Sequence, residues 1–257
     1  MTRVAVVTGA ARGIGAAVVR RLVADGCAVV AVDACADDPH IPYPLGTRAD
    51  LDALEGERVT PVVADVRDID ELRAAARIAV DSYGGLDVAV AVAGVIGGGA
   101  PQWDTDVDTE RAVIDVDLVG VLNLARAAVP LMLDRPVPRD GRFVAVASAA
   151  ATRGMPGLAA YSAAKAGVAG FVRGLAADLR GTGITANAVS PGSTRTPILD
   201  ESARLYELPT VEVFARQQPI ERLIEPDEVA AAVSWLASAG AGAVTGADVP
   251  VDGGLSL

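Results

Sequence analysis

The chain has 257 residues, 51% of them hydrophobic, and a formal net charge of -11. This length suits one large α/β domain or two small ones, and the acidic balance argues against a nucleic-acid-binding surface, which needs clustered basic side chains. Two cysteines and the single His40 cannot build a Cys/His zinc site, and a Ser-His-Asp triad would have to use His40. We therefore expect no metal site, no nucleic-acid partner and no hydrolase triad.

Membrane insertion and export are not expected either. The longest charge-free stretch lies between Asp87 and Asp104 and is broken by four glycines and a proline, unlike a membrane-spanning helix. The first residues lead directly into an apolar, strand-like segment without the layout of a signal peptide. A cytoplasmic protein is the resulting expectation.

Strands and helices are predicted to alternate along the whole chain. Short runs rich in β-branched residues predict strands at 4–8, 28–33, 59–64, 88–93, 142–147, 184–189 and 246–251. Helical patterns predict helices at 14–24, 69–83, 109–133, 158–180 and 226–237. Near-continuous apolar strands that alternate with helices indicate a parallel sheet covered on both faces. The predicted fold is a Rossmann-type, doubly wound α/β sheet in a single domain spanning residues 1–257.

A glycine-rich turn joins the first predicted strand to the first helix. It reads TGAARGIG over residues 8–15. Glycines keep such a turn tight and bring the amides of a helix N-terminus close to a pyrophosphate, whose charge those amides stabilise. A purely structural turn is the alternative, but the position inside a βαβ unit favours a dinucleotide site. The candidate cofactor-binding residues here are Gly9, Arg12, Gly13, Ile14 and Gly15.

Asp33 ends the second predicted strand, 18 positions after Gly15 (33 minus 15), close to the roughly 20 expected for a ribose-binding acid. Its carboxylate can accept a hydrogen bond from the adenosine 2'-hydroxyl and would repel a 2'-phosphate, by about 4 kcal/mol at 4 Å in an effective dielectric of 20. Arg12 could attract a 2'-phosphate but also suits a pyrophosphate or surface role. The sequence therefore favours NAD over NADP.

Lys165 is the single lysine among 22 basic residues, and it follows Tyr161 by four positions. On a helix this spacing places the ammonium beside the phenol. Free tyrosine has a pKa of about 10, and a nearby cation favours its charged form. We therefore expect Lys165 to lower the pKa of Tyr161 and make it a general acid/base. The alternative is a packing tyrosine beside a solvated surface lysine.

Taken together, the motifs resemble those of the short-chain dehydrogenase/reductase family, and the resemblance covers essentially the whole chain. They are TGAARGIG at 8–15, Asp65-Val66, Ala93-Gly94, Ser148, YSAAK at 161–165 and NAVSPG at 187–192. In that family a serine lies thirteen positions before the tyrosine, as Ser148 does here (161 minus 148). The resemblance implies an NAD-dependent alcohol dehydrogenase or carbonyl reductase.

The same resemblance implies a role for each matching residue. Ser148 would hydrogen-bond the substrate oxygen, Tyr161 would transfer its proton, and Lys165 would hold the nicotinamide ribose. Asp65 would contact adenine, and Thr196 would face the nicotinamide carboxamide. The other cofactor-binding residues implied are Val66, Ala93, Gly94, Pro191, Gly192 and Thr194.

Two positions depart from the family pattern. The strand that often ends in Asn-Asn-Ala-Gly reads Ala91-Val92-Ala93-Gly94 here. The helical asparagine that often completes a catalytic tetrad aligns with Asp117, and Asn123 lies nearly two turns away. Asp117 is a candidate catalytic residue, and its charge is expected to stabilise the Lys165 ammonium and weaken its pull on Tyr161.

The segment after Asp33 is longer than the family's usual connection. It forms an expected insertion at about 34–56 that is rich in proline and then becomes helical in pattern. This insertion resembles that of the mycofactocin-coupled branch of the family, in which NAD is retained and electrons pass to mycofactocin. Tyr43 and its neighbours are expected to cover the dinucleotide.

The substrate is expected to be a small apolar alcohol or its carbonyl compound. Residues 97–103, 153–157 and 198–218 are expected to shape its pocket, the last of these within a substrate loop at about 193–220. Met155, Leu199, Leu205 and Phe214 would make that pocket apolar, although these four side chains could equally serve core packing. A homotetramer is implied by the resemblance. The alternatives are a carbonyl reductase with freely exchanging NAD(H) and a catalytically silent NAD-binding sensor.

Overall fold

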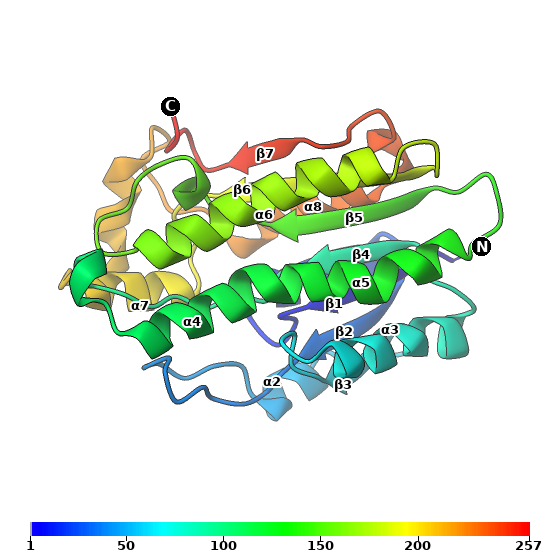
Figure 1. Ribbon diagram of the computed structural model, residues 1–257, viewed down its shortest axis with the longest axis horizontal. Helices are drawn as coiled ribbons and strands as arrows, with labels where there is room; N and C mark the ends of the chain where they lie inside the picture. The colour runs from blue at the N-terminus through cyan, green and yellow to red at the C-terminus, as the bar shows by residue number, and fades with distance from the viewer. Residues whose placement is uncertain (1) are drawn as a thin grey trace.

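The computed structural model describes residues 2–257 and contains one seven-stranded sheet, ordered β3-β2-β1-β4-β5-β6-β7, in which every pair of neighbours is parallel. The strands are β1 (Val4–Thr8), β2 (Ala28–Asp33), β3 (Val59–Val63), β4 (Val88–Ala91), β5 (Gly141–Val146), β6 (Ile184–Pro191) and β7 (Asp248–Val251). The crossover from β3 back to β4, beside β1, creates the switch point of a doubly wound sheet. The predicted single-domain Rossmann-type fold is confirmed (Figure 1).

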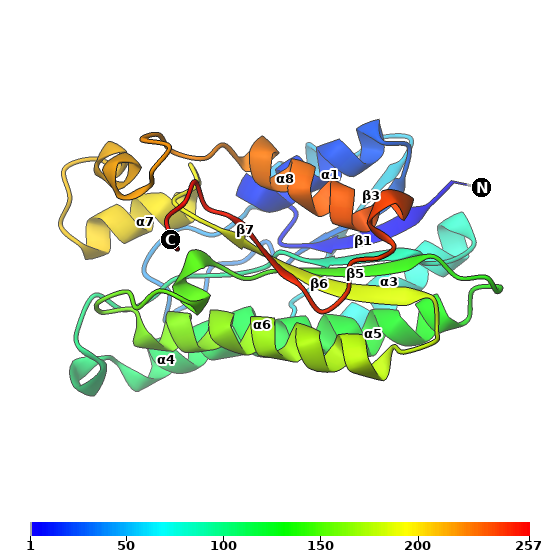
Figure 2. The same ribbon diagram turned by 90° about the horizontal axis from the view of Figure 1, so that it is seen from above.

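Helices cover both faces of this sheet. They are α1 (Gly13–Ala24), α2 (Arg48–Asp52), α3 (Ile69–Tyr83), α4 (Val107–Ile114), α5 (Gly120–Leu133), α6 (Ala159–Asp178), α7 (Pro197–Leu205) and α8 (Pro226–Ala237). Figure 2 shows α1 and α8 on one face and α3, α4, α5 and α6 on the other. All residues of β1, β4 and β5 are buried, as expected for strands that pack on both sides. Two apolar cores result, one on each face.

Most predicted elements are found within a few residues of their predicted ends. β4 ends at Ala91 instead of residue 93 because the amides of Val92 and Ala93 donate to the Thr8 hydroxyl oxygen, at 3.2 and 3.4 Å, rather than to a neighbouring strand. β6 continues to Pro191 because its last two residues pair with β7. Helix α7 was not predicted.

The long helix predicted at 109–133 is interrupted. Its two α-helical parts, α4 and α5, are joined by a π-helical turn over Asp115–Val119. The whole stretch has a mean hydropathy of 1.6 in its most apolar part, comparable to a membrane helix, but α5 packs against α3 and β4 as part of the core. Isolated π turns inside helices are often found at functional sites, and this one contains Asp117.

Candidate functional site

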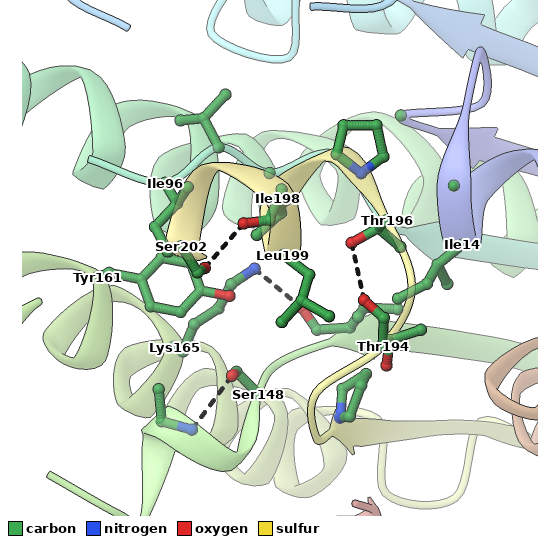
Figure 3. Close-up of a pocket in the computed structure, with 18 of the residues that line it drawn as sticks. Ile14, Ile96, Ser148, Tyr161, Lys165, Thr194, Thr196, Ile198, Leu199 and Ser202 are labelled. Atoms are coloured by element: carbon green, nitrogen blue, oxygen red, sulfur yellow. Dashed lines mark hydrogen bonds between the residues drawn. The ribbon is translucent and has the colours of Figure 1, made fainter. Parts of the chain in front are cut away.

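A cavity of about 780 Å³ opens at the carboxyl ends of the strands, where doubly wound sheets bind their ligands. Its wall contains every predicted catalytic and cofactor-binding residue except Asp117, which is fully buried behind Lys165. Figure 3 shows Ser148, Tyr161 and Lys165 on one side of this space and Ile14, Thr194 and Thr196 on another. Residues from distant parts of the chain therefore meet around a single cavity.

The glycine-rich turn lies against the end of β4. Gly9 has a φ of +66°, and a Cβ atom there would lie 2.6 Å from the backbone nitrogen and Cα of Ala93, so only glycine fits. Helix α1 begins at Gly13 without a side-chain cap on its first amides and without an acidic residue in its first turn. These amides are available to an anionic group such as a pyrophosphate.

Asp33 is held at the end of β2 by two backbone amides. Its carboxylate oxygens accept hydrogen bonds from Ala11 at 3.0 Å and from Cys35 at 3.1 Å. Each oxygen keeps a further lone pair, so the carboxylate is oriented and can still accept a hydrogen bond from a ribose hydroxyl.

Asp65 lines the cavity but is already paired. Both of its carboxylate oxygens accept hydrogen bonds from the Arg67 guanidinium, whose Nη1 also donates to Asp38 at 2.6 Å. Burial opposes ionisation, but these bonds keep the pKa of Asp65 below its usual value. Arg67 thereby links the adenine side of the cavity to residue 38 of the insertion. The sequence carries no local signal for this Arg67–Asp38 ion pair.

The segment 34–56 folds inward against both halves of the cavity. A Cβ on its Gly46 would lie 3.2 Å from an Asp33 carboxylate oxygen. Arg12, a predicted cofactor-binding residue, donates to the Pro44 carbonyl oxygen at 2.6 Å and lies over the Tyr43 ring at 5.6 Å. The Arg12 side chain thus fastens the insertion to the glycine-rich turn.

Tyr43 continues this connection toward the catalytic residues. Its hydroxyl oxygen accepts a hydrogen bond from the Ile96 amide at 3.0 Å, and burial raises the pKa of the Tyr43 phenol. Nearby, Ile41 is buried in the same apolar cluster as Ile96 and Tyr161. The insertion therefore reaches the substrate side of the cavity as well as the adenosine side.

The Lys165 ammonium is held by a backbone carbonyl and a buried carboxylate. Its Nζ donates to the Val146 carbonyl oxygen at 3.2 Å and lies 3.1 Å from Asp117 Oδ2, while Asp117 Oδ1 accepts a hydrogen bond from the Val95 amide at 2.8 Å. Only 4% of Lys165 and none of Asp117 is exposed. The π turn places the Asp117 carboxylate at this point, so the lysine has a buried counter-ion.

These charges act on Tyr161, whose ring centroid lies 5.6 Å from Lys165 Nζ. Burial raises the pKa of the Tyr161 phenol; the Lys165 charge works in the opposite direction, and the Asp117 charge raises it further. Burial works to lower the pKa of Lys165, but the charges of Asp117 and Tyr161 raise it. The Lys165 charge thus acts to lower the pKa of Tyr161 as expected, but burial and the Asp117 charge outweigh it, and the net pKa lies above the ordinary value.

Ser148 follows β5 and caps a short 3-10 turn over Ala149–Ala151. Its hydroxyl oxygen accepts a hydrogen bond from the Ala150 amide at 3.1 Å, and the hydroxyl group acts to lower the pKa of Tyr161. Tyr161 itself stands in the first turn of α6. The two hydroxyl groups therefore face the same part of the cavity from different elements (Figure 3).

Pro191, Gly192, Thr194 and Thr196 follow β6 and form the wall beside the glycine-rich turn, where a Cβ on Gly13 would lie 3.3 Å from Thr196 Cγ2. The Thr194 hydroxyl donates to the Gly192 carbonyl oxygen at 3.0 Å, and the Thr196 hydroxyl donates to the Thr194 carbonyl oxygen at 3.2 Å. This loop leads directly into α7, which covers the cavity.

The substrate half of the cavity is defined here as its lining residues within 95–96, 148–158 and 198–217, together with Leu255. Met155, Leu199 and Phe214 lie in this wall as expected. The expected stretch 97–103 does not line the cavity, since Val95 and Ile96 take its place and Trp103 is 84% exposed. Leu205 packs behind the wall in the apolar cluster that contains Ile41.

Proteins of known family resemble this chain over almost its whole length. Residues 9–256 match the family model described as "Enoyl-(Acyl carrier protein) reductase". The chain is 42% identical to cis-4-hydroxycyclohexanecarboxylate dehydrogenase of Sinomonas cyclohexanicum, over 98% of this chain and 96% of that one.

Two solved structures extend the comparison. Carveol dehydrogenase from Mycobacterium avium in complex with NAD has a TM-score of 0.93 and 30% identity, over 98% of this chain and 97% of that one. A short-chain dehydrogenase from Mycobacterium paratuberculosis bound to NAD has a TM-score of 0.87 and 31% identity, over 99% and 97%. The chain belongs to the short-chain dehydrogenase/reductase family.

Proposed function

We propose that this protein is an NAD-dependent dehydrogenase that interconverts a cyclic secondary alcohol and its ketone. The observation that carries the proposal is the meeting of Ser148, Tyr161 and Lys165 with the glycine-rich turn and Asp33 around one cavity. Relatives named for oxidising hydroxycyclohexanecarboxylate and carveol support a cyclic alcohol as substrate. The apolar side chains in the substrate half of the cavity suit the carbon skeleton of such a ring.

The residues of the chain would hold the cofactor along the length of the cavity. The amides at the start of α1 would receive the pyrophosphate, Asp33 the adenosine ribose, and Lys165 the nicotinamide ribose. When bound, NAD supplies the hydride acceptor for alcohol oxidation. Asp33 supports NAD over NADP because its oriented carboxylate would repel a 2'-phosphate.

Tyr161 and Ser148 would perform the proton chemistry. Both hydroxyl groups face the substrate half, where Ser148 would donate a hydrogen bond to the substrate oxygen and Tyr161, as phenolate, would accept the alcohol proton. Lys165 favours that phenolate, and its own charge is maintained by Asp117. In the reverse direction Tyr161 would return the proton to the ketone oxygen.

The test is Tyr161→Phe, assayed on a panel of cyclic alcohols with NAD or an artificial electron acceptor. Loss of turnover by at least about a hundredfold is expected, since general acid/base groups typically contribute 10²–10⁴-fold. Tyr83→Phe is the matched control because Tyr83, on α3, shares a hydrogen bond with Thr60 of β3, away from the cavity. Unchanged turnover in Tyr161→Phe would exclude this role, whereas a folded wild type that turns over no alcohol would favour an NAD-binding sensor.

We further propose that the bound NAD is not exchanged and that its electrons pass to mycofactocin. The support is the way 34–56 is fastened across the cavity: Arg12 binds Pro44, Arg67 binds Asp38, and Tyr43 binds Ile96. A dinucleotide beneath these contacts would leave only after they open. Native mass spectrometry of the purified cytoplasmic protein tests NAD retention and the expected homotetramer together. Complete loss of NAD on gel filtration would support an enzyme with freely exchanging NAD(H) instead.

A further inference from the structure

Arg153 stands apart from the other charged residues of the cavity. Arg12, Asp33, Asp38, Asp65 and Arg67 all line its adenosine side, and Lys165 lies at the catalytic centre. In the substrate half, Arg153 is the only charged side chain in the wall. No carboxylate within the described residues 2–257 forms an ion pair with it.

Two hydrogen bonds hold Arg153 at the edge of the substrate half. The Arg153 amide donates to the Ala149 carbonyl oxygen at 2.9 Å, which places the residue directly after the turn that Ser148 caps. Its Nη1 donates to the Leu255 carbonyl oxygen at 2.7 Å. The turn containing Leu255 is itself held by Asp252, whose carboxylate accepts hydrogen bonds from the amides of Gly254 and Ser256 at 2.9 Å each.

One edge of the Arg153 side chain is thus attached to protein, while its other N–H groups have no hydrogen-bond partner in the described chain. A guanidinium presents paired N–H groups that match the two oxygens of a carboxylate. Arg153 lines the cavity and is also exposed to solvent. A ligand can therefore reach its guanidinium from solution, and the unpaired charge stays hydrated until the ligand binds.

We infer that Arg153 binds a substrate carboxylate, so that the natural substrate is a cyclic hydroxy acid whose acid group lies away from the reacting hydroxyl. The apolar wall would contact the ring, Ser148 and Tyr161 the hydroxyl, and Arg153 the carboxylate. This inference rests on the proposed dehydrogenase function and narrows its substrate class. A neutral terpene alcohol of similar size would leave the guanidinium without a partner.

The test compares cis-4-hydroxycyclohexanecarboxylate with the corresponding neutral carboxamide as substrates. Wild-type protein should prefer the carboxylate, and Arg153→Met should lower kcat/KM for it by roughly 10- to 100-fold, the size of a lost charge-assisted hydrogen bond. Turnover of the carboxamide should change less than about twofold by the same reasoning. Arg153→Lys should restore part of the preference because it keeps the charge. Arg20→Met is the matched control, since Arg20 is exposed on α1 and does not line the cavity.

Calorimetric titration with cyclohexanecarboxylate and with cyclohexanecarboxamide decides the matter independently of turnover. Binding of the carboxylate that weakens selectively in Arg153→Met supports the inference. Equal effects on both ligands, or equal affinity of the wild type for both, overturn it and leave Arg153 only as a tie to the C-terminal turn. Absence of turnover with every alcohol, in a folded wild type that binds the carboxylate, would instead count against the proposed dehydrogenase function.

Discussion

At the scale of single residues, the unusual feature is the buried ion pair between Lys165 and Asp117, with a 3.1 Å separation. Two buried charges stabilise each other strongly, but each also bears a desolvation cost. Here the carboxylate raises the pKa of Lys165 and also that of Tyr161. Asp117 thus keeps Lys165 protonated but makes the Tyr161 phenolate harder to form.

Asp117→Asn should therefore keep turnover similar or raise it. Alcohol oxidation needs the Tyr161 phenolate, so its rate rises with pH through the pKa of that phenol; removing the Asp117 charge lowers this pKa and shifts the rising limb to lower pH. A kcat profile against pH measures the shift, and Asp115→Asn, an exposed neighbour in the same π turn, should leave it in place. Collapse of activity with an unchanged circular dichroism spectrum would refute this account. Thermal stability should fall, since the buried ammonium loses its counter-ion.

At the scale of elements, the sequence predicted the strands and most helices because their apolar periodicity is local. The glycine-rich turn and the family motifs also predicted the catalytic and cofactor-binding residues that line the cavity, whereas the predicted stretch 97–103 lies outside the wall that Val95 and Ile96 form. The π turn at Asp115–Val119 was not predicted, because it preserves the apolar pattern of the surrounding helix. The packing of 34–56 could not be predicted from the hydrophobic pattern either, because it depends on pairs such as Asp38 and Arg67, which are 29 positions apart in the sequence.

The glycine-rich turn gives a test at this scale. Gly9→Ala forces a Cβ to 2.6 Å from the backbone of Ala93 and places alanine at a φ of +66°, a conformation that costs roughly 1–2 kcal/mol before any clash. We expect a lower melting temperature and loss of bound NAD, measured by calorimetry and native mass spectrometry. Gly56→Ala is the control because a Cβ there meets nothing within 4 Å. Full NAD occupancy in Gly9→Ala would show that the turn tolerates displacement from β4.

The insertion gives a second test. Tyr43→Phe leaves the Ile96 amide without its acceptor, at a cost of about 1–3 kcal/mol for an unsatisfied buried donor. We expect the segment 34–56 to open more often and NAD to dissociate at least several-fold faster, followed by nucleotide fluorescence after dilution. Tyr83→Phe also loses one hydroxyl hydrogen bond, to Thr60, but lies away from the cavity, so its release rate should match the wild type. Equal release from both variants would mean that Tyr43 does not restrain the cofactor.

At the scale of the whole molecule, the cavity joins segments from the first to the last strand, since its wall extends from Gly9 to Leu255. A ligand that binds only the folded chain stabilises all of it, by about 2.7 kcal/mol at a hundred times its Kd. NAD added to nucleotide-free protein should therefore raise the melting temperature as one cooperative transition. NADP should raise it less, because its 2'-phosphate meets the Asp33 carboxylate, which the amides of Ala11 and Cys35 hold in place. In Asp33→Asn the charge disappears and the two nucleotides should stabilise the protein more equally. Equal stabilisation of the wild type by NAD and NADP, measured by scanning calorimetry at matched concentrations, would show that Asp33 does not select the cofactor.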